Sequence, residues 1–185
     1  MQTYIALLRG INVGGHKKIK MAELKLLFEK LGFKDVTTYI QSGNVVFSSP
    51  SPQRGKSDFA EIIFEGIKKQ FGYEVPVLVK TVDDVVQILK NCPFDEEKKA
   101  ASYFMLLATP PKKELMELVK EISYPNEEFV LTPECVYIYF SKGYGNAKLN
   151  NNFFEKKLKV AATTRNYRTL VKLLELAEYF MPRTA

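Results

Sequence analysis

The sequence is poor in the residues that bind metals and perform covalent catalysis. It contains two cysteines, Cys92 and Cys135, and a single histidine, His16. The cysteines lie far apart, without a CxxC pair or a cysteine–histidine cluster, which argues against a zinc site and a disulfide framework. A Ser-His-Asp or Cys-His catalytic system would depend on the one loop histidine. The sequence therefore predicts neither a metal centre nor a cofactor, and it gives catalysis little support.

Long apolar segments are also missing. No uninterrupted apolar run approaches the ~20 residues needed to span a bilayer. The N-terminal residues 1–10 lack the basic start and the small-residue cleavage site of a secretory signal. We therefore predict a cytoplasmic protein with no membrane partner. Hydrophobic residues still make up 46 % of the chain, which is enough to form the core of one full-sized domain or two small ones.

Positive charge is in excess, with a formal net charge of +6. This charge permits attraction to nucleic acid, anionic metabolites or acidic proteins, but it selects none of them. Ordinary solvated lysines would give the same balance.

The first half of the chain has the pattern of a β-α-β-β-α-β unit. Its helices are indicated by apolar residues at helical spacing, and its strands by short β-rich runs. The predicted elements are a strand over residues 3–9, a helix over 20–31, a hairpin of strands over 36–40 and 44–47, a helix from Ser57 or Asp58 to Gly72, and a strand over 75–79. The run over 3–9 has no strict alternation, which predicts burial on both faces in the middle of a sheet.

The second half repeats this order after a linking helix over 81–89, which opens at Thr81. The predicted elements are a strand over 102–108, a helix from about 110 with the apolar stripe Leu115, Leu118, Val119 and Ile122, strands over 128–131 and 135–140, and helices over 151–158 and 164–177. We therefore predict an α+β protein of two pseudo-duplicated ferredoxin-like (β-α-β-β-α) halves. The halves span 1–80 and 100–185, joined by residues 81–99. A single mixed sheet covered by five or six helices is the alternative.

Polar residues converge at one edge of the predicted first half. In this topology the loop after the first strand and the turn of the hairpin share an edge. Glycines there free backbone N–H groups to bind an anion, and the basic side chains supply charge. The candidate site comprises Arg9, Asn12, Gly14, Gly15, His16, Lys17 and Lys18 from the loop, and Gln41, Ser42 and Asn44 from the turn. The alternative is structural: the glycines form a tight turn, residues 41–44 form the hairpin and the lysines are solvated.

Established nucleotide and nucleic-acid signatures do not match. Gly10 and Gly15 have P-loop separation, but His16 stands where the lysine belongs and no Ser or Thr follows Lys17. Residues 10–15 also lack the opening of the dinucleotide fingerprint. An RNA-recognition sheet has the same element order, but its stacking positions hold Asn44 and Val46 instead of aromatics.

The C-terminal helices suggest a different nucleic-acid reading. Helices over 151–158 and 164–177, separated by the short connection 159–162, could form a helix-turn-helix. The alternative is that Thr163 or Thr164 caps a helix that simply docks on a sheet.

Three separated motifs carry a family likeness. They are RGINVGG at residues 9–15, YIQSGNVVF at 39–47 and TTRN at 163–166. Together they resemble the bacterial domain-of-unknown-function family 1697 (DUF1697), and the resemblance extends over essentially the whole chain. It implies a single-domain cytoplasmic protein with a duplicated ferredoxin-like fold and no established activity. It also adds Arg165 and Asn166 to the candidate site. Tyr167 departs from the family pattern, which has tryptophan there.

Three functions are compatible with these observations. The leading hypothesis is a non-catalytic binding module for an anionic ligand, a nucleotide or nucleic-acid phosphate, at the glycine-rich loop. The first alternative is an enzyme acting on a small phosphorylated or carboxylated metabolite positioned by Arg9, Gln41 and Asn44. The second is a protein-interaction scaffold, which would present an exposed apolar patch. The sequence leaves the oligomeric state open.

Overall fold

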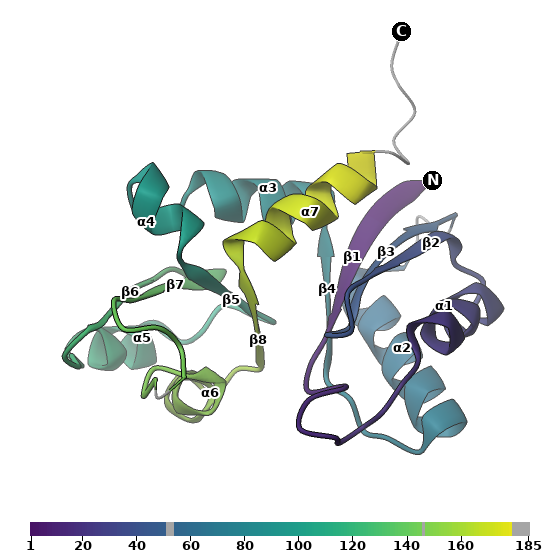
Figure 1. The fold of residues 1–185 in the computed structure, drawn as a ribbon, viewed down its shortest axis with the longest axis horizontal. Coiled ribbons are helices and arrows are strands. Elements are labelled where there is room, and N and C mark those ends of the chain that lie inside the picture. Colours follow the sequence, from purple (N-terminus) through teal and green to yellow (C-terminus); the bar gives the residue numbers. More distant parts are fainter. Residues whose placement is uncertain (51–53, 146, 179–185) are drawn as a thin grey trace, which may run out of the picture. The chain divides into compact units, whose positions relative to one another are not determined.

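The chain folds into two separate antiparallel sheets. The computed structural model describes residues 1–50, 54–145 and 147–178. Over these residues it is an α+β structure with two four-stranded sheets and seven helices (Figure 1). This excludes the single mixed sheet. The chain divides into two compact units, one of Met1–Val86 with the chain from Val171 onward, the other of Gln87–Leu170.

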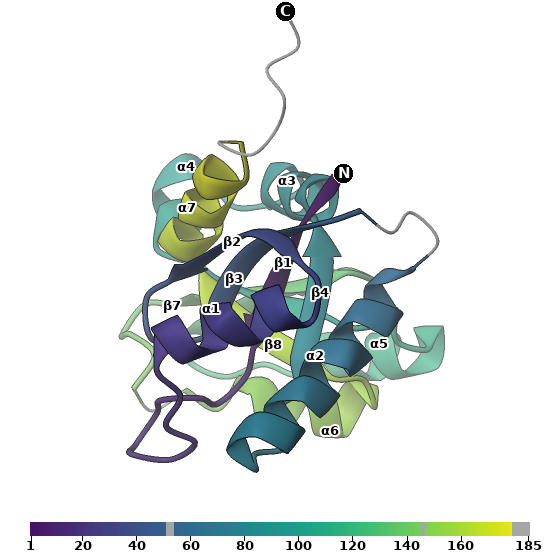
Figure 2. The ribbon, with the colours of Figure 1, turned by 90° about the vertical axis from the view of Figure 1, so that its right-hand side faces the viewer.

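The sheet of the first unit has the strand order β2-β3-β1-β4, with every neighbouring pair antiparallel. Helices α1 and α2 lie on the same face of it (Figure 2). In chain order the elements are β1 (Gln2–Leu8), α1 (Met21–Lys30), β2 (Lys34–Tyr39), β3 (Asn44–Ser49), α2 (Lys56–Phe71) and β4 (Val77–Thr81). Strand β1 is a central strand and its residues 4–8 are buried on both faces, as predicted.

Aromatic rings fill the core between the helices and this sheet. Phe47 is fully buried, and its ring centroid lies 4.5 Å from that of Phe33 and 5.5 Å from that of Phe28. Such ring pairs add about 0.5–1.5 kcal/mol beyond the burial of apolar area. The predicted helical stripes also form, because Leu24 and Leu27 of α1 are buried in this core, as are Phe59, Ile63 and Ile67 of α2.

Helix α3 (Val82–Lys90) begins with a reciprocal cap. The Asp84 N–H donates to Thr81 Oγ1 at 3.1 Å, and the Thr81 N–H donates to Asp84 Oδ2 at 2.9 Å. Lys56 Nζ also donates to Asp84 Oδ2, at 2.6 Å. Partial burial raises the pKa of the Asp84 carboxyl, but the hydrogen bonds from Lys56 and Thr81 outweigh it and the net pKa is lowered. The predicted helix start at Thr81 is confirmed.

The sheet of the second unit has the order β6-β7-β5-β8, again with antiparallel neighbours. Helices α5 and α6 supply Met116, Val119, Phe154 and Leu158 to its core. The elements after α3 are α4 (Glu96–Ala100), β5 (Tyr103–Leu107), α5 (Lys113–Lys120), β6 (Glu127–Leu131), β7 (Cys135–Phe140), α6 (Asn151–Leu158), β8 (Ala162–Asn166) and α7 (Tyr167–Glu178). Helix α4 is a short element that the sequence pattern did not predict.

The predicted helix over 164–177 was wrong at its start. Residues 162–166 form strand β8, in which Thr163 pairs with Leu106 and Thr164 with Met105 of β5. β-Branched threonines favour this extended backbone. Asn166, not a threonine, caps the following helix, because its Oδ1 accepts the Thr169 N–H at 2.9 Å. A strand therefore separates α6 from α7, and the helix-turn-helix reading was wrong.

Three further predictions need smaller corrections. Helix α5 begins at Lys113 instead of about 110, and Leu118 is 68 % exposed, so the predicted stripe was wrong at that position. Strand β4 begins at Val77 instead of residue 75.

Cys135 is buried and Cys92 half-buried, and burial raises the pKa of the Cys92 thiol. No helix among the described residues has the length and apolar character needed to cross a membrane.

Candidate functional site

The loop after β1 and the β2–β3 turn meet at one edge of the first sheet, as predicted. The Leu8 N–H donates to Gly43 O at 2.8 Å. Asn12 Nδ2 donates to Gln41 O at 2.9 Å. These bonds join the end of β1 and the loop over residues 9–18 to residues 40–43, which are far apart from them in sequence, and we call the surface formed by residues 9–18 and 40–43 the loop–turn edge.

A third segment, residues 73–76, reaches the same edge and was not predicted. The Arg9 N–H donates to Pro76 O at 3.0 Å, and Lys17 Nζ donates to Glu74 O at 2.6 Å. Since β4 runs antiparallel to β1, Val77 at the start of β4 lies opposite Leu8 at the end of β1. The strand directions alone therefore contained the signal that would have placed this segment at the edge.

The Glu74 carboxylate at this edge is already paired. Lys68 Nζ lies 2.8 Å from Glu74 Oε1. The hydrogen bond from Lys68 lowers the pKa of Glu74, and the same bond raises the pKa of Lys68. The negative charge nearest the loop is thus offset by a lysine outside it.

The loop itself is a small hairpin with a two-residue turn. The Asn12 N–H donates to Lys17 O at 3.2 Å, and the His16 N–H donates to Val13 O at 3.0 Å. Gly14 and Gly15 at the tip have φ of 57° and 78°. Two successive positive φ angles are typical of the turns that match strand twist, and glycine adopts them without steric cost. The positive φ angles of the turn thus explain why positions 14 and 15 are both glycine.

The tip amides remain accessible. Within the described residues, no hydrogen bond is donated by the N–H of Gly14 or of Gly15. Both glycines are exposed, and the position a Cβ would occupy at Gly15 is open space. The tip therefore presents two backbone donors to the solvent.

The Asn12 side chain holds the base of this hairpin in place through hydrogen bonds. Its Oδ1 accepts the Ile19 N–H at 2.9 Å, and its Nδ2 donates to Ile19 O at 2.9 Å as well as to Gln41 O. Its φ of 55° lies in the left-handed region, where asparagine is one of the better tolerated residues. The side-chain amide is engaged on both sides, which gives Asn12 a structural role.

Asn44 and Ser42 hold the turn from inside. Asn44 is fully buried, and its Nδ2 donates to Tyr39 O at 3.1 Å and to Ser42 Oγ at 2.9 Å. A residue with no exposed surface cannot touch a ligand in this conformation. Gln41, by contrast, has an exposed side chain.

Backbone strain is concentrated beside the turn. Ile40 has φ of 47° although it is β-branched, and its side chain is 50 % exposed. A left-handed conformation costs about 1–2 kcal/mol for a residue with a Cβ. Strain of this kind often marks a functional site. Val13, which follows Asn12 in the sequence, is also an exposed apolar residue.

Basic residues recur along the loop. His16 and Lys18 are exposed, whereas Arg9 and Lys17 are half-buried. The loop over residues 9–18 contains no acidic residue. Among the described residues, no group of three or more His, Cys, Asp or Glu side chains could hold a metal ion. The loop–turn edge thus combines accessible amides with positive charge, a combination suited to anions.

Arg165 and Asn166 lie in the second unit, on β8. Arg165 Nη1 donates to Thr164 O at 2.9 Å, and burial lowers the pKa of Arg165 to about 10, which still leaves it charged at neutral pH. Asn166 caps α7. A ligand-binding role for these two residues stays a prediction.

The family described as "Protein of unknown function (DUF1697)" matches residues 1–137, which include both motifs of the loop–turn edge. The chain belongs to this family. A solved structure, "conserved bacterial protein SP0830 from Streptococcus pneumoniae", is similar over 95 % of this chain and 98 % of that chain, with 24 % sequence identity and a TM-score of 0.69. At this identity the likeness establishes a shared fold. No curated protein matches the DUF1697 chain.

Proposed function

We propose that this protein is a non-catalytic binding module that holds an anionic ligand, a nucleotide or a nucleic-acid phosphate, at the loop–turn edge. The observation that carries the proposal is the hairpin tip, where the Gly14 and Gly15 N–H groups face solvent beside His16 and Lys18. Phosphate oxygens accept hydrogen bonds from such amides, and lysine adds charge without demanding a fixed geometry.

The candidate residues divide into two roles under this proposal. Gly14, Gly15 and Lys18 contact the ligand, with Arg9 and Gln41 beside them at the edge. Asn12, Ser42 and Asn44 hold the loop against the turn, because their side-chain bonds are internal. Lys17, which donates to Glu74 O, fastens the loop to residues 73–76 and contributes charge.

The expected affinity is modest. A hydrogen bond to a charged group contributes about 1.5–3 kcal/mol. Two amides and one lysine would together supply about 4.5–9 kcal/mol, which corresponds to dissociation constants from somewhat below 1 mM to somewhat below 1 µM. Because these groups are exposed, salt should weaken binding markedly.

The enzyme alternative is less well supported. It would require Asn44 to position a substrate, but Asn44 is fully buried. Arg9 and Gln41 can hold an anion, yet neither is a good general acid or base at neutral pH. Binding without turnover therefore fits the edge better.

We also propose that the two units are copies of one ferredoxin-like arrangement. The support is that both sheets have the same strand order when the strands are numbered within each unit, β2-β3-β1-β4 and β6-β7-β5-β8. A bacterial origin and a cytoplasmic location stay predictions.

The binding proposal is tested by matched charge reversals. Lys18→Glu places a negative charge beside the tip, whereas Lys34→Glu makes the same change at an exposed position on β2. Fluorescence polarisation with a labelled short oligothymidylate and competition with ATP should show at least a tenfold loss for Lys18→Glu and less than a threefold loss for Lys34→Glu.

Equal losses of affinity in the two variants would mean that binding depends only on the net charge of the protein, and this result would refute the site. Reversal of Arg9 and Lys17 is a second test, with the urea midpoint measured in parallel because both side chains are half-buried. Unchanged binding in the folded double variant would also discard the site.

A further inference from the structure

Two exposed apolar side chains belong to the loop–turn edge. Val13 is 62 % exposed and Ile40 is 50 % exposed. They are far apart in sequence, but each is the direct neighbour of a residue in one hydrogen bond, since Asn12 Nδ2 donates to Gln41 O at 2.9 Å. Single apolar residues on a surface are common in folded proteins. Here the fold brings two of them to one edge, beside the proposed anion site.

The backbone of Ile40 makes its exposure more unusual. Its φ of 47° lies in the left-handed region, where a β-branched residue is a rare outlier and asparagine or glycine is the ordinary choice. Neither Ile40 nor Val13 is part of the hydrophobic core that the described residues of the first unit form. Packing within the unit therefore does not explain an apolar side chain at position 40, and strain of this kind often marks a functional position.

The apolar surface at this edge is too small for a protein partner. A specific protein interface buries about 800 Å² on each partner. Proteins that dock in this way present contiguous apolar patches of several hundred Å². Val13 and Ile40 offer only two aliphatic side chains. They suit a small apolar group, such as one face of a planar ring.

The polar groups of the edge lie close to these two side chains. Gly14 is two residues from Asn12, and because the chain spans at most about 3.6 Å per residue, the tip lies within about 7 Å of Asn12. The side chain of Gln41 is exposed, and its amide can both donate and accept hydrogen bonds. Donors for phosphate, an apolar pair and a polar amide thus occur together.

We infer that the ligand of the loop–turn edge carries a nucleobase next to its phosphate. The phosphate lies at the tip amides, the base packs on Val13 and Ile40, and the Gln41 amide lies at the polar edge of the base. Nucleobases combine flat faces that pack on apolar side chains with an edge that forms hydrogen bonds. This inference rests on the proposed function and narrows it, because an inorganic phosphate chain gains nothing from the apolar pair. A free nucleotide and a nucleic-acid single strand share this chemistry.

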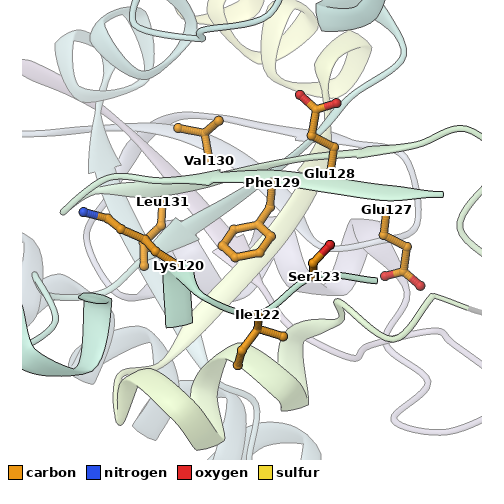
Figure 3. Close-up of a pocket in the computed structure, with 8 residues that line it drawn as sticks. All are labelled: Lys120, Ile122, Ser123, Glu127, Glu128, Phe129, Val130 and Leu131. Atoms are coloured by element: carbon orange, nitrogen blue, oxygen red, sulfur yellow. The ribbon is translucent and has the colours of Figure 1, made fainter. Parts of the chain in front are cut away.

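The groove along β6 in the second unit does not suit such a ligand. It has a volume of about 370 Å³, and Glu127 and Glu128 are among the residues that line it (Figure 3). Lys120, which also lines it, already pairs with Glu117 at 2.7 Å. Carboxylates repel phosphate. Val130 in β6 is 36 % exposed and therefore provides a control valine outside the proposed site.

The inference is tested by comparing ligands with and without a base. The variants are Val13→Ser, Ile40→Asn and their combination, with Val130→Ser as the matched control; asparagine tolerates the left-handed backbone at position 40. Isothermal titration calorimetry in magnesium-free buffer compares ATP with tripolyphosphate. The double variant should bind ATP at least about fivefold more weakly, the loss expected when about 40 Å² of apolar surface is no longer buried. Its affinity for tripolyphosphate, and both affinities of Val130→Ser, should change less than about twofold.

A second comparison separates the two sources of the base. Oligothymidylate is measured against an abasic strand of the same length with the same variants. A loss of affinity for ATP in the double variant marks a free nucleotide as the ligand. A loss confined to oligothymidylate marks a single strand.

Equal losses for the ligands with and without a base would overturn the inference and leave the anion site in place. Unchanged affinities for ATP and oligothymidylate in the double variant, shown to be folded by circular dichroism, would overturn it as well. Ile40→Asn alone keeps the test valid if Val13→Ser disturbs the hairpin, because position 40 lies outside it. A wild-type protein that binds none of the four ligands would refute the anion site itself, and the nucleobase with it.

Discussion

Replacing Gly43 with alanine should disrupt the contact that presses the β2–β3 turn onto the loop. A Cβ at this position would lie 2.7 Å from Leu8 Cβ and 2.9 Å from Ile11 Cδ1, and both of these residues are fully buried. The φ of 77° adds the left-handed penalty. The two costs are about 1–2 kcal/mol for the backbone and about 1–3 kcal/mol for overpacking, so Gly43→Ala should lose about 2–5 kcal/mol.

Gly72 provides a matched control for this prediction. It has a φ of 73° at the end of α2, but a Cβ there would meet nothing within 4 Å. Gly72→Ala should therefore lose only the backbone part, about 1–2 kcal/mol. Urea unfolding followed by circular dichroism gives both values. Equal losses in the two variants would refute the argument that close approach, in addition to φ, requires glycine at position 43.

Two other predictions concern stability. Ile40→Gly should raise the free energy of unfolding by about 0.5–1 kcal/mol in urea titrations, because it relieves a strained and half-exposed isoleucine; a loss would mean that Ile40 packs productively. Asp84→Asn should cost about 1 kcal/mol at pH 7 through the weakened α3 cap. The pKa of Asp84 is lowered in the folded state. The stabilisation by its carboxylate is therefore present above the ordinary aspartate pKa and is lost as the pH falls through the folded-state pKa. The melting temperatures of wild type and variant should converge in acid.

The strands and helices of the first unit could be predicted because local pattern and tertiary role agree there. Leu24, Leu27 and Phe28 repeat at helical spacing and all three are buried. The meeting of the loop with the turn followed from strand directions alone. The same reasoning would have placed residues 73–76 at the edge, because β4 must begin where β1 ends.

Strand β8 was missed because its local signals are weak. The segment 162–166 is short and polar at all positions except Ala162, and no glycine or proline separates it from α7. Pairing with β5, a contact distant in sequence, decides their conformation. Leu118 shows the opposite error, since helical spacing suggested burial but the side chain faces solvent.

The sequence also could not show which candidate-site residues hold the loop and turn together and which face solvent. Asparagine is common in turns, whether its amide serves the backbone or a ligand. Only the coordinates show that the Asn12 amide joins Ile19 to Gln41 and that Asn44 is fully buried. The accessible donors are backbone N–H groups, which carry no side-chain signature.

Ligand binding at the loop–turn edge depends most directly on the amides of Gly14 and Gly15. In ¹H–¹⁵N correlation spectra of the labelled protein, titration with pyrophosphate or oligothymidylate should shift the cross-peaks of these two glycines together with that of His16, in a saturable and salt-sensitive manner. Gly72, an exposed glycine outside the tip, should stay unshifted. Saturating shifts elsewhere in the chain, with Gly14 and Gly15 unmoved, would contradict the proposed site.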